Sequence, residues 1–213
     1  MLLFGFLAAA LAGTTASAAQ PYQDVKAGSV TLRVPYPDGY CLPNGDRAEG
    51  FAKLAAGDRR NVTLLTLVDC KPHSASNRYL IVKEPVSSLD MPVDRAEMIK
   101  EVSATFTQPD VAAELKLIPQ TVATDKSAAT GVQINVVSTF SPRGHDDVCV
   151  YLGGPIATTK LGKTHDQAGG TCLTVVGARV IALNAYDDTN NPQAFKSLLP
   201  QMKLWALQIR PAP

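Results

Sequence analysis

The segment TCLTVVGARVIALNAYDD, residues 171–188, carries the strongest secondary-structure signal of the chain. β-Branched and apolar residues fill both of its halves, which is typical of strands. The halves meet at Gly177-Ala178, and a two-residue loop with glycine first is typical of a tight hairpin. The sequence therefore predicts an antiparallel hairpin in the last quarter of the chain.

Five further segments on the N-terminal side of this hairpin indicate strands. Residues 28–35 alternate apolar with polar side chains, as a half-buried strand requires. Residues 61–70 (NVTLLTLVDC) are apolar enough for a central strand. The others are residues 79–83, 132–140 and 148–154.

Helical patterns occupy two regions before the hairpin. One is the amphipathic stretch Asp46–Ala56, which Gly57 stops. The other runs from Pro92 to Leu117, where Pro109 begins a second segment. We expect residues 119–130 to form a polar connection.

A final helix follows the hairpin. Asn191 is suited to cap it, with Pro192 at its first position. Pro200 should kink this helix or restart it. Apolar residues recur at spacings of three and four, which predicts a core-facing stripe: Phe195, Leu198, Leu199, Met202 and Trp205.

The composition, 46% hydrophobic and 18% charged, is ordinary for a globular protein. With 20 basic and 19 acidic residues and no run of like charge, neither nucleic acid nor an anionic membrane is an indicated partner. We expect one α+β domain over residues 19–213, mainly an antiparallel sheet packed against helices, with an amphipathic helix at its C-terminus.

The N-terminal segment has the character of a secretory signal. MLLFGFLAAALAGTTASAAQ is apolar and too short for a settled transmembrane helix, and Ala16-Ser17-Ala18 offers the small residues that signal peptidase needs. We expect residues 1–18 to be removed, leaving a periplasmic or secreted protein with no stable membrane span. The alternative is a retained N-terminal anchor.

Four cysteines in an exported chain indicate two disulfides. We favour Cys41 with Cys70 and Cys149 with Cys172, because each pair flanks one local unit and short loops close more easily. Four thiolates on one zinc ion is the alternative, but the spacings lack the close pairs that zinc sites use.

The order of elements resembles a known fold group. An early G-x-V-x-L-x-V-P-x-P-x-G-Y strand, here in GSVTLRVPYPDGYC, and the stretch from Thr171 to Ile209 are similar to the Mog1/PsbP/DcrB-like α/β group. Tyr40-Cys41 and Asp69-Cys70 also resemble motifs of uncharacterised exported bacterial proteins. These resemblances imply a sandwich of sheet and helices and a non-catalytic accessory or envelope protein, with no catalytic residues to carry over.

ATTKLGKT, residues 157–164, matches the loose form of a phosphate-binding loop. A true phosphate loop opens a helix, whereas Gly169-Gly170 would break a helix here almost at once. We interpret the stretch as a loop joining two paired strands and expect no nucleotide or other cofactor.

The three histidines are His73, His145 and His165. Asp146 and Asp147 follow His145, and Asp166 follows His165, so these segments could converge on a metal ion or form a general base. The competing interpretation is that they are hydrogen-bonding turn residues, since no nucleophile is identified.

Two hypotheses about function remain. The leading one is a non-enzymatic module that uses a concave sheet face or a loop rim to bind a protein partner or a small ligand in the cell envelope. The alternative is a small envelope hydrolase or metal-dependent enzyme centred on His145 and His165, which requires the two imidazoles to lie close together.

Overall fold

The computed structural model describes residues 20–70, 78–89, 91–189 and 191–213. The predicted signal peptide, residues 1–18, lies outside the described residues, and so does His73.

The helices and strands follow one another in a mixed order. The helices are α1 (Gly45–Ala56), the single 3₁₀ turn η1 (Val86–Ser88), α2 (Arg95–Thr105), α3 (Pro109–Thr130) and α4 (Phe195–Gln208). The strands before α2 are β1 (Tyr22–Ala27), β2 (Val30–Pro35), β3 (Tyr40–Cys41), β4 (Asn61–Asp69) and β5 (Tyr79–Pro85). Those after α3 are β6 (Ile134–Ser138), β7 (Ser141–His145), β8 (Val150–Lys160), β9 (Lys163–Val176), β10 (Arg179–Asp188) and β11 (Arg210–Pro211).

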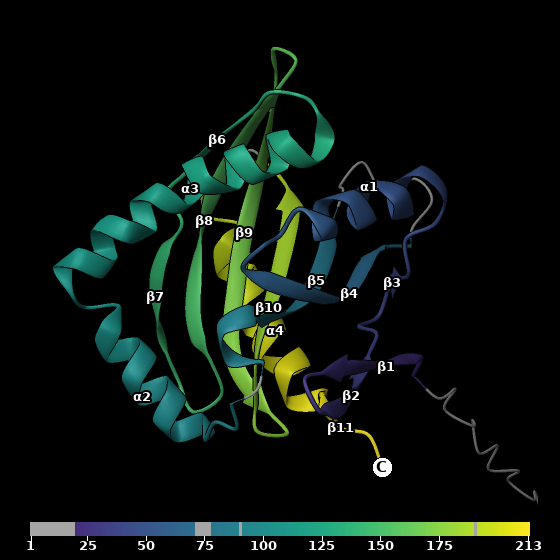
Figure 1. Ribbon diagram of the computed structural model, residues 1–213, viewed down its shortest axis with the longest axis vertical. Helices are drawn as coiled ribbons and strands as arrows, with labels where there is room; N and C mark the ends of the chain where they lie inside the picture. Colours follow the sequence, from purple (N-terminus) through teal and green to yellow (C-terminus); the bar gives the residue numbers. More distant parts are fainter. Residues whose placement is uncertain (1–19, 71–77, 90, 190) are drawn as a thin grey trace, which may run out of the picture.

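The main sheet is antiparallel, in the order β3-β4-β5-β10-β9-β8-β6, with β7 paired to β8 (Figure 1). The predicted hairpin lies at its centre: Arg179 pairs with Val176, and the loop is Gly177-Ala178. Both loop residues have positive φ, 57° and 61°, so Ala178 adopts the left-handed conformation as well as the glycine. The predicted α+β class is confirmed.

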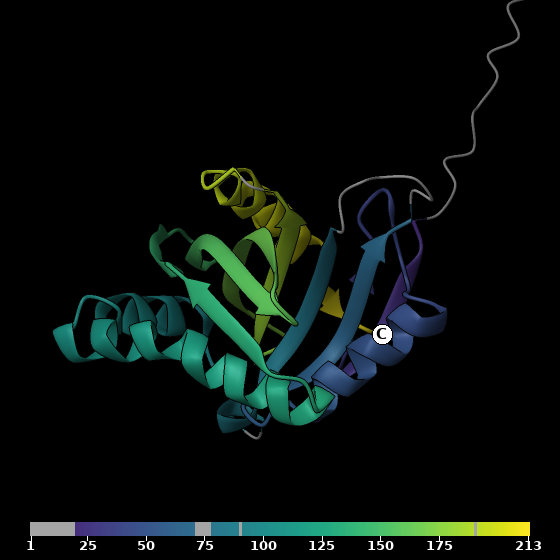
Figure 2. The same ribbon diagram turned by 90° about the horizontal axis from the view of Figure 1, so that it is seen from above.

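Helices and a small second sheet cover the two faces of the main sheet. The small sheet, β1-β2-β11, and α4 lie behind it, whereas α1, α2 and α3 lie in front (Figures 1 and 2). Most of the core lies between the main sheet and the elements behind it, built around Leu32, Leu67, Ile181, Leu183 and Met202. A smaller cluster, which includes Met98 and Val180, packs α2 onto the front face.

The predicted stripe on α4 faces the core. Phe195, Met202 and Trp205 are each at most 3% exposed. The helix approaches the sheet closely because Gly153 and Gly170, which oppose each other on β8 and β9, lie beneath it. A Cβ added at Gly170 would lie 2.8 Å from the terminal methyl of Met202.

Pro200 does not restart α4, which runs unbroken from Phe195 to Gln208. Because proline has no backbone N–H, Pro200 cannot donate the helical hydrogen bond that the carbonyl of Lys196 would otherwise accept. Both Lys196 and Pro200 are exposed, so water can satisfy this carbonyl. The surface location of the proline therefore explains why the helix tolerates it.

The expected polar connection at residues 119–130 is wrong, because α3 continues through Pro119 to Thr130. It ends where Gly131 adopts a left-handed conformation, with φ of 67°, and donates its N–H to the carbonyl of Ser127. Contacts with β6 and α1 hold this segment against the sheet. Tertiary packing therefore outweighs the low helix propensity of its proline and polar residues.

Both disulfides join the pairs expected from the sequence, Cys41 with Cys70 and Cys149 with Cys172. The first links β3 to the end of β4 at one edge of the main sheet. The second lies in the core, where Cys149, just before β8, and Cys172 of β9 are both fully buried. No cysteine among the described residues is free.

Candidate functional site

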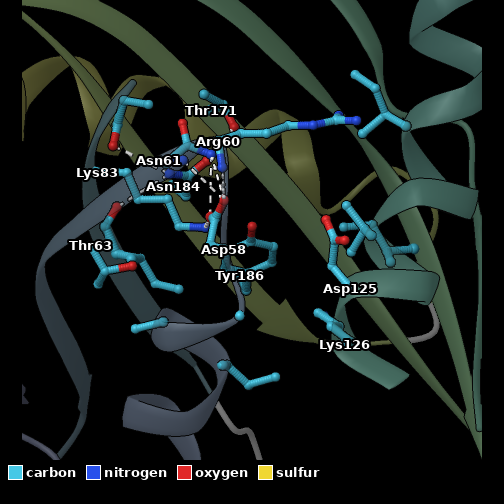
Figure 3. Close-up of a pocket in the computed structure, with 18 of the residues that line it drawn as sticks. Asp58, Arg60, Asn61, Thr63, Lys83, Asp125, Lys126, Thr171, Asn184 and Tyr186 are labelled. Atoms are coloured by element: carbon cyan, nitrogen blue, oxygen red, sulfur yellow. Dashed lines mark hydrogen bonds and ion pairs between the residues drawn. The ribbon is translucent and has the colours of Figure 1, made fainter. Parts of the chain in front are cut away.

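A cavity of about 570 Å³ lies on the front face of the main sheet, between α1 and α3. Strands β4, β5, β8, β9 and β10 form its floor. Figure 3 shows Asp58 and Lys83 on one side, with Asp125 and Lys126 of α3 facing them across the open space. This volume is within the range of about 300–1,000 Å³ that is typical of sites for small molecules.

The side chains of strand β5 are divided between the cavity and the core. Successive side chains of a strand point to opposite faces, so Tyr79, Ile81 and Lys83 line the cavity while Leu80 and Val82 enter the core behind the sheet. Helices α1 and α3 contact each other at one end of this face, and α2 packs at the other. The middle of the face between them remains uncovered.

The walls of the cavity are largely apolar. Phe51 and Leu54 come from α1, Ile118 and Val122 from α3, and Ile156 from β8. Each is only partly buried by the rest of the chain, so a ligand in the cavity would remove further apolar surface from water.

One end of the cavity holds an ion pair between Lys83 and Asp58, with Nζ and Oδ2 2.6 Å apart. Asp58 also accepts hydrogen bonds from the backbone N–H groups of Arg60 and Asn61 and from the Asn61 side chain. Burial favours the neutral form of Asp58, but Lys83 and these donors outweigh it and lower its pKa. Asp58 is therefore a carboxylate anion whose two oxygens already accept hydrogen bonds from Lys83, Arg60 and Asn61.

The polar groups at the centre of the floor are also satisfied from within the chain. Thr171 donates to Asn184 Oδ1 at 2.7 Å, and Asn184 Nδ2 donates to the carbonyl of Ala182 at 3.2 Å. Beside them the rings of Tyr79 and Tyr186 stack with centroids 4.5 Å apart. Burial raises the pKa of both phenols, so they remain neutral and offer polarity without charge.

Lys126 on α3 differs from these groups. It is half-buried, and no residue in the described ranges forms a side-chain hydrogen bond or an ion pair with its amine. Burial, and secondarily the charge of Lys83, lower the pKa of Lys126. The cavity thus contains a cation that lacks a counterion.

Little in the amino-acid pattern indicates this cavity. Tyr-Leu-Ile-Val-Lys in β5 has apolar residues on both of its faces, so its pattern does not reveal which face stays open. The polar pattern of residues 119–130, which carry Val122 and Lys126, predicts a polar connection and not a helix. The one available signal was the spacing of Ile118, Val122 and Lys126, which places them on one side of a helix.

Residues 157–164, the phosphate-loop pattern, form the tip of the β8–β9 hairpin. The prediction that this stretch lies between two paired strands is confirmed, but its assignment as a loop is wrong for most of it: residues 157–160 end β8, 163–164 begin β9, and only Leu161-Gly162 form the turn. Lys160 pairs with Lys163 across the turn, and β9 follows the pattern where a phosphate loop would open a helix. The backbone N–H groups here therefore belong to a strand ladder and do not converge on an anion.

The structure does not bring His145 and His165 together. His145 on β7 pairs with Val150 of β8, and His165 on β9 pairs with Thr158 of the same strand. Eight residues of strand separate these partners, which is about 26 Å. Within the described part of the chain, no group of three His, Cys, Asp or Glu side chains is arranged to hold a metal ion.

Each of the two segments has a local hydrogen-bonding role. His165 Nε2 lies 2.8 Å from Asp188 Oδ1, which also accepts from Gln167. Asp146 accepts from the backbone N–H groups of Val148 and Cys149, as the turn interpretation expects. None of the residues in these two segments lines the cavity between α1 and α3. Gln167, which follows the second segment on β9, does line it.

Asp146→Asn should destabilise the protein at neutral pH and have no effect near pH 2. Burial opposes the charge of Asp146, but Lys203, 2.9 Å away, and the turn N–H groups lower its pKa to about 2. A depressed pKa stabilises the fold above the unfolded pKa of about 4, and this contribution disappears as the pH falls toward 2. Urea unfolding at several pH values measures the difference.

Asp147→Asn is the matched control for that experiment. Asp147 also contacts Lys203, at 3.1 Å, but its side chain is 86% exposed, so we expect little change at any pH. A loss of stability in Asp146→Asn that stayed constant from pH 7 to pH 2 would contradict the role of its charge.

No family model matches the chain, and no curated protein matches it. Among solved structures, one similar chain is LpqN, described as involved in cell envelope biogenesis of Mycobacterium tuberculosis. The two are 15% identical, the match covers 92% of each chain, and the TM-score is 0.32. A TM-score this low transfers neither fold nor function. No helix in the described ranges is long and apolar enough to cross a membrane.

Proposed function

We propose that this protein is an exported, non-enzymatic binding protein that holds a small amphipathic ligand in the cavity between α1, α3 and the main sheet. The observation that carries the proposal is the cavity itself, which combines apolar walls with a few polar and charged groups on a rigid sheet. The two disulfides support an oxidising compartment, periplasmic or extracellular.

The arrangement of polar groups favours binding over catalysis. Asp58, Thr171 and Asn184 are each hydrogen-bonded within the chain, so they shape the cavity and do not activate a substrate. Apolar walls give affinity through the area they remove from water, and the remaining polar groups orient the ligand.

Binding of the neutral dye N-phenyl-1-naphthylamine tests the proposal. We expect the dye to bind the parent protein with an increase in fluorescence, and Ala182→Phe to weaken binding at least tenfold. Ala182 lies on the floor of the cavity, on the central strand β10, and a phenyl ring there would occupy space that the dye needs. A fluorescence titration gives both dissociation constants.

Val137→Phe is the matched control, because Val137 of β6 is 62% exposed and does not line this cavity. It adds the same ring outside the site and should leave dye binding unchanged. A thermal melt confirms that each variant is folded. A parent protein that does not bind the dye, or equal binding by both variants, would refute the proposed function.

A further inference from the structure

We infer that the ligand of this cavity is an amphiphile with one negative charge, whose anionic head pairs with Lys126 while its chain lies along Ile118 and Val122. This inference rests on the proposed function and specifies the class of ligand. Three observations carry it: the charge balance of the cavity, the unpaired amine and the layout of α3.

The first observation is the balance of charge. The charged side chains that line the cavity in the described ranges are Asp58, Arg60, Lys83, Asp125 and Lys126. Asp58 and Lys83 neutralise each other at 2.6 Å. The remaining two cations and one anion leave a single positive charge, so one negative charge on the ligand would make the cavity neutral.

The second observation locates that charge. No described residue supplies an acceptor for the amine of Lys126, which is half-buried and close enough to Lys83 for their charges to repel. Asp58 cannot serve both amines, because Lys83 and the neighbouring N–H groups occupy it. A carboxylate of the ligand would form with the Lys126 amine the ion pair that no described residue forms.

The third observation is the direction in which polarity changes along α3. Ile118, Val122 and Lys126 follow one another at intervals of four residues and form one row along the helix. Eight residues of helix extend about 12 Å, so the row presents an apolar strip that ends in a cation. Leu152 and Ile156 of β8 line the same cavity. This layout matches an alkyl chain with an anionic end.

Displacement of the bound dye by two amphiphiles of equal chain length tests the inference. Dodecanoate is the anionic probe and dodecyltrimethylammonium the cationic probe, both used below their micelle concentrations. We expect dodecanoate to displace N-phenyl-1-naphthylamine from the parent protein at concentrations at least tenfold lower than those that dodecyltrimethylammonium requires. Lys126→Met, which keeps the length and apolar stem of the side chain, should reduce this preference to about twofold or less, with each probe's displacement referred to that variant's own dissociation constant for the dye.

Lys160→Met is the matched control, since Lys160 is exposed at the β8–β9 hairpin and does not line the cavity. It removes the same charge and should retain the preference for dodecanoate. Equal displacement by both probes in the parent would overturn the inference while the proposed function stood. Loss of the preference in Lys160→Met as well would show a general charge effect and overturn the role of Lys126. A parent that failed to bind the dye would overturn both proposals.

Discussion

Trp205→Ala is expected to lower the free energy of unfolding by about 3–5 kcal/mol, the usual cost of removing a large aromatic side chain from a core. Trp205 is 3% exposed, and its indole Nε1 donates to the carbonyl of Pro35 at 2.8 Å. The substitution therefore leaves a cavity beneath α4 and removes the donor for a carbonyl at the end of β2. For a domain of this size the melting temperature should fall by roughly 6–20 °C.

Circular dichroism is the appropriate measurement, because Trp205 is the only tryptophan of the chain and its loss removes the fluorescence signal. Leu204→Ala is the matched control. Leu204 neighbours Trp205 on the opposite side of α4 and is 62% exposed, so its truncation should change stability by about 0.5 kcal/mol or less. Equal losses in the two variants would contradict the assignment of the buried face of α4.

Replacing Cys149 and Cys172 together with alanine should cost at least about 3–4 kcal/mol. The bridge closes a loop with a sequence separation of 23 residues, and the chain-entropy model gives this magnitude for such a loop. Both cysteines are fully buried, so the double variant also loses core packing between the sheet and α4. Denaturant unfolding under oxidising conditions measures the loss.

The corresponding double variant of Cys41 and Cys70 separates the two contributions. Its loop is similar, with a sequence separation of 29, but Cys41 is half-buried and Cys70 is exposed. Chain entropy alone predicts nearly equal losses, whereas burial makes the Cys149–Cys172 variant the less stable of the two. We expect the second result. A loss of less than about 1 kcal/mol for the Cys149–Cys172 variant would exclude a stabilising role for that bridge.

How much of this protein could be predicted from its sequence depended on the range of the interactions involved. The hairpin at Gly177-Ala178, the stripe on α4 and the pairing of the cysteines were predicted because each depends on residues close together in the chain. The candidate site was not predicted. The histidine hypothesis assumed that two hairpin segments meet at one end of the sheet, but strand register places His145 and His165 at opposite ends of β8.

The α+β class and the central hairpin follow from the amino-acid sequence alone, because turn chemistry and short-range periodicity fix them. The sequence also favoured the observed cysteine pairs, because short loops close more easily. The continuation of α3 past Pro119 and the cavity beneath it became evident from the packing of the folded chain. Strands β5 and β10 carry apolar residues on both faces. Their pattern shows that both faces are covered, but which helix covers each face, and where a gap remains, follows from how α1, α2 and α3 pack in three dimensions.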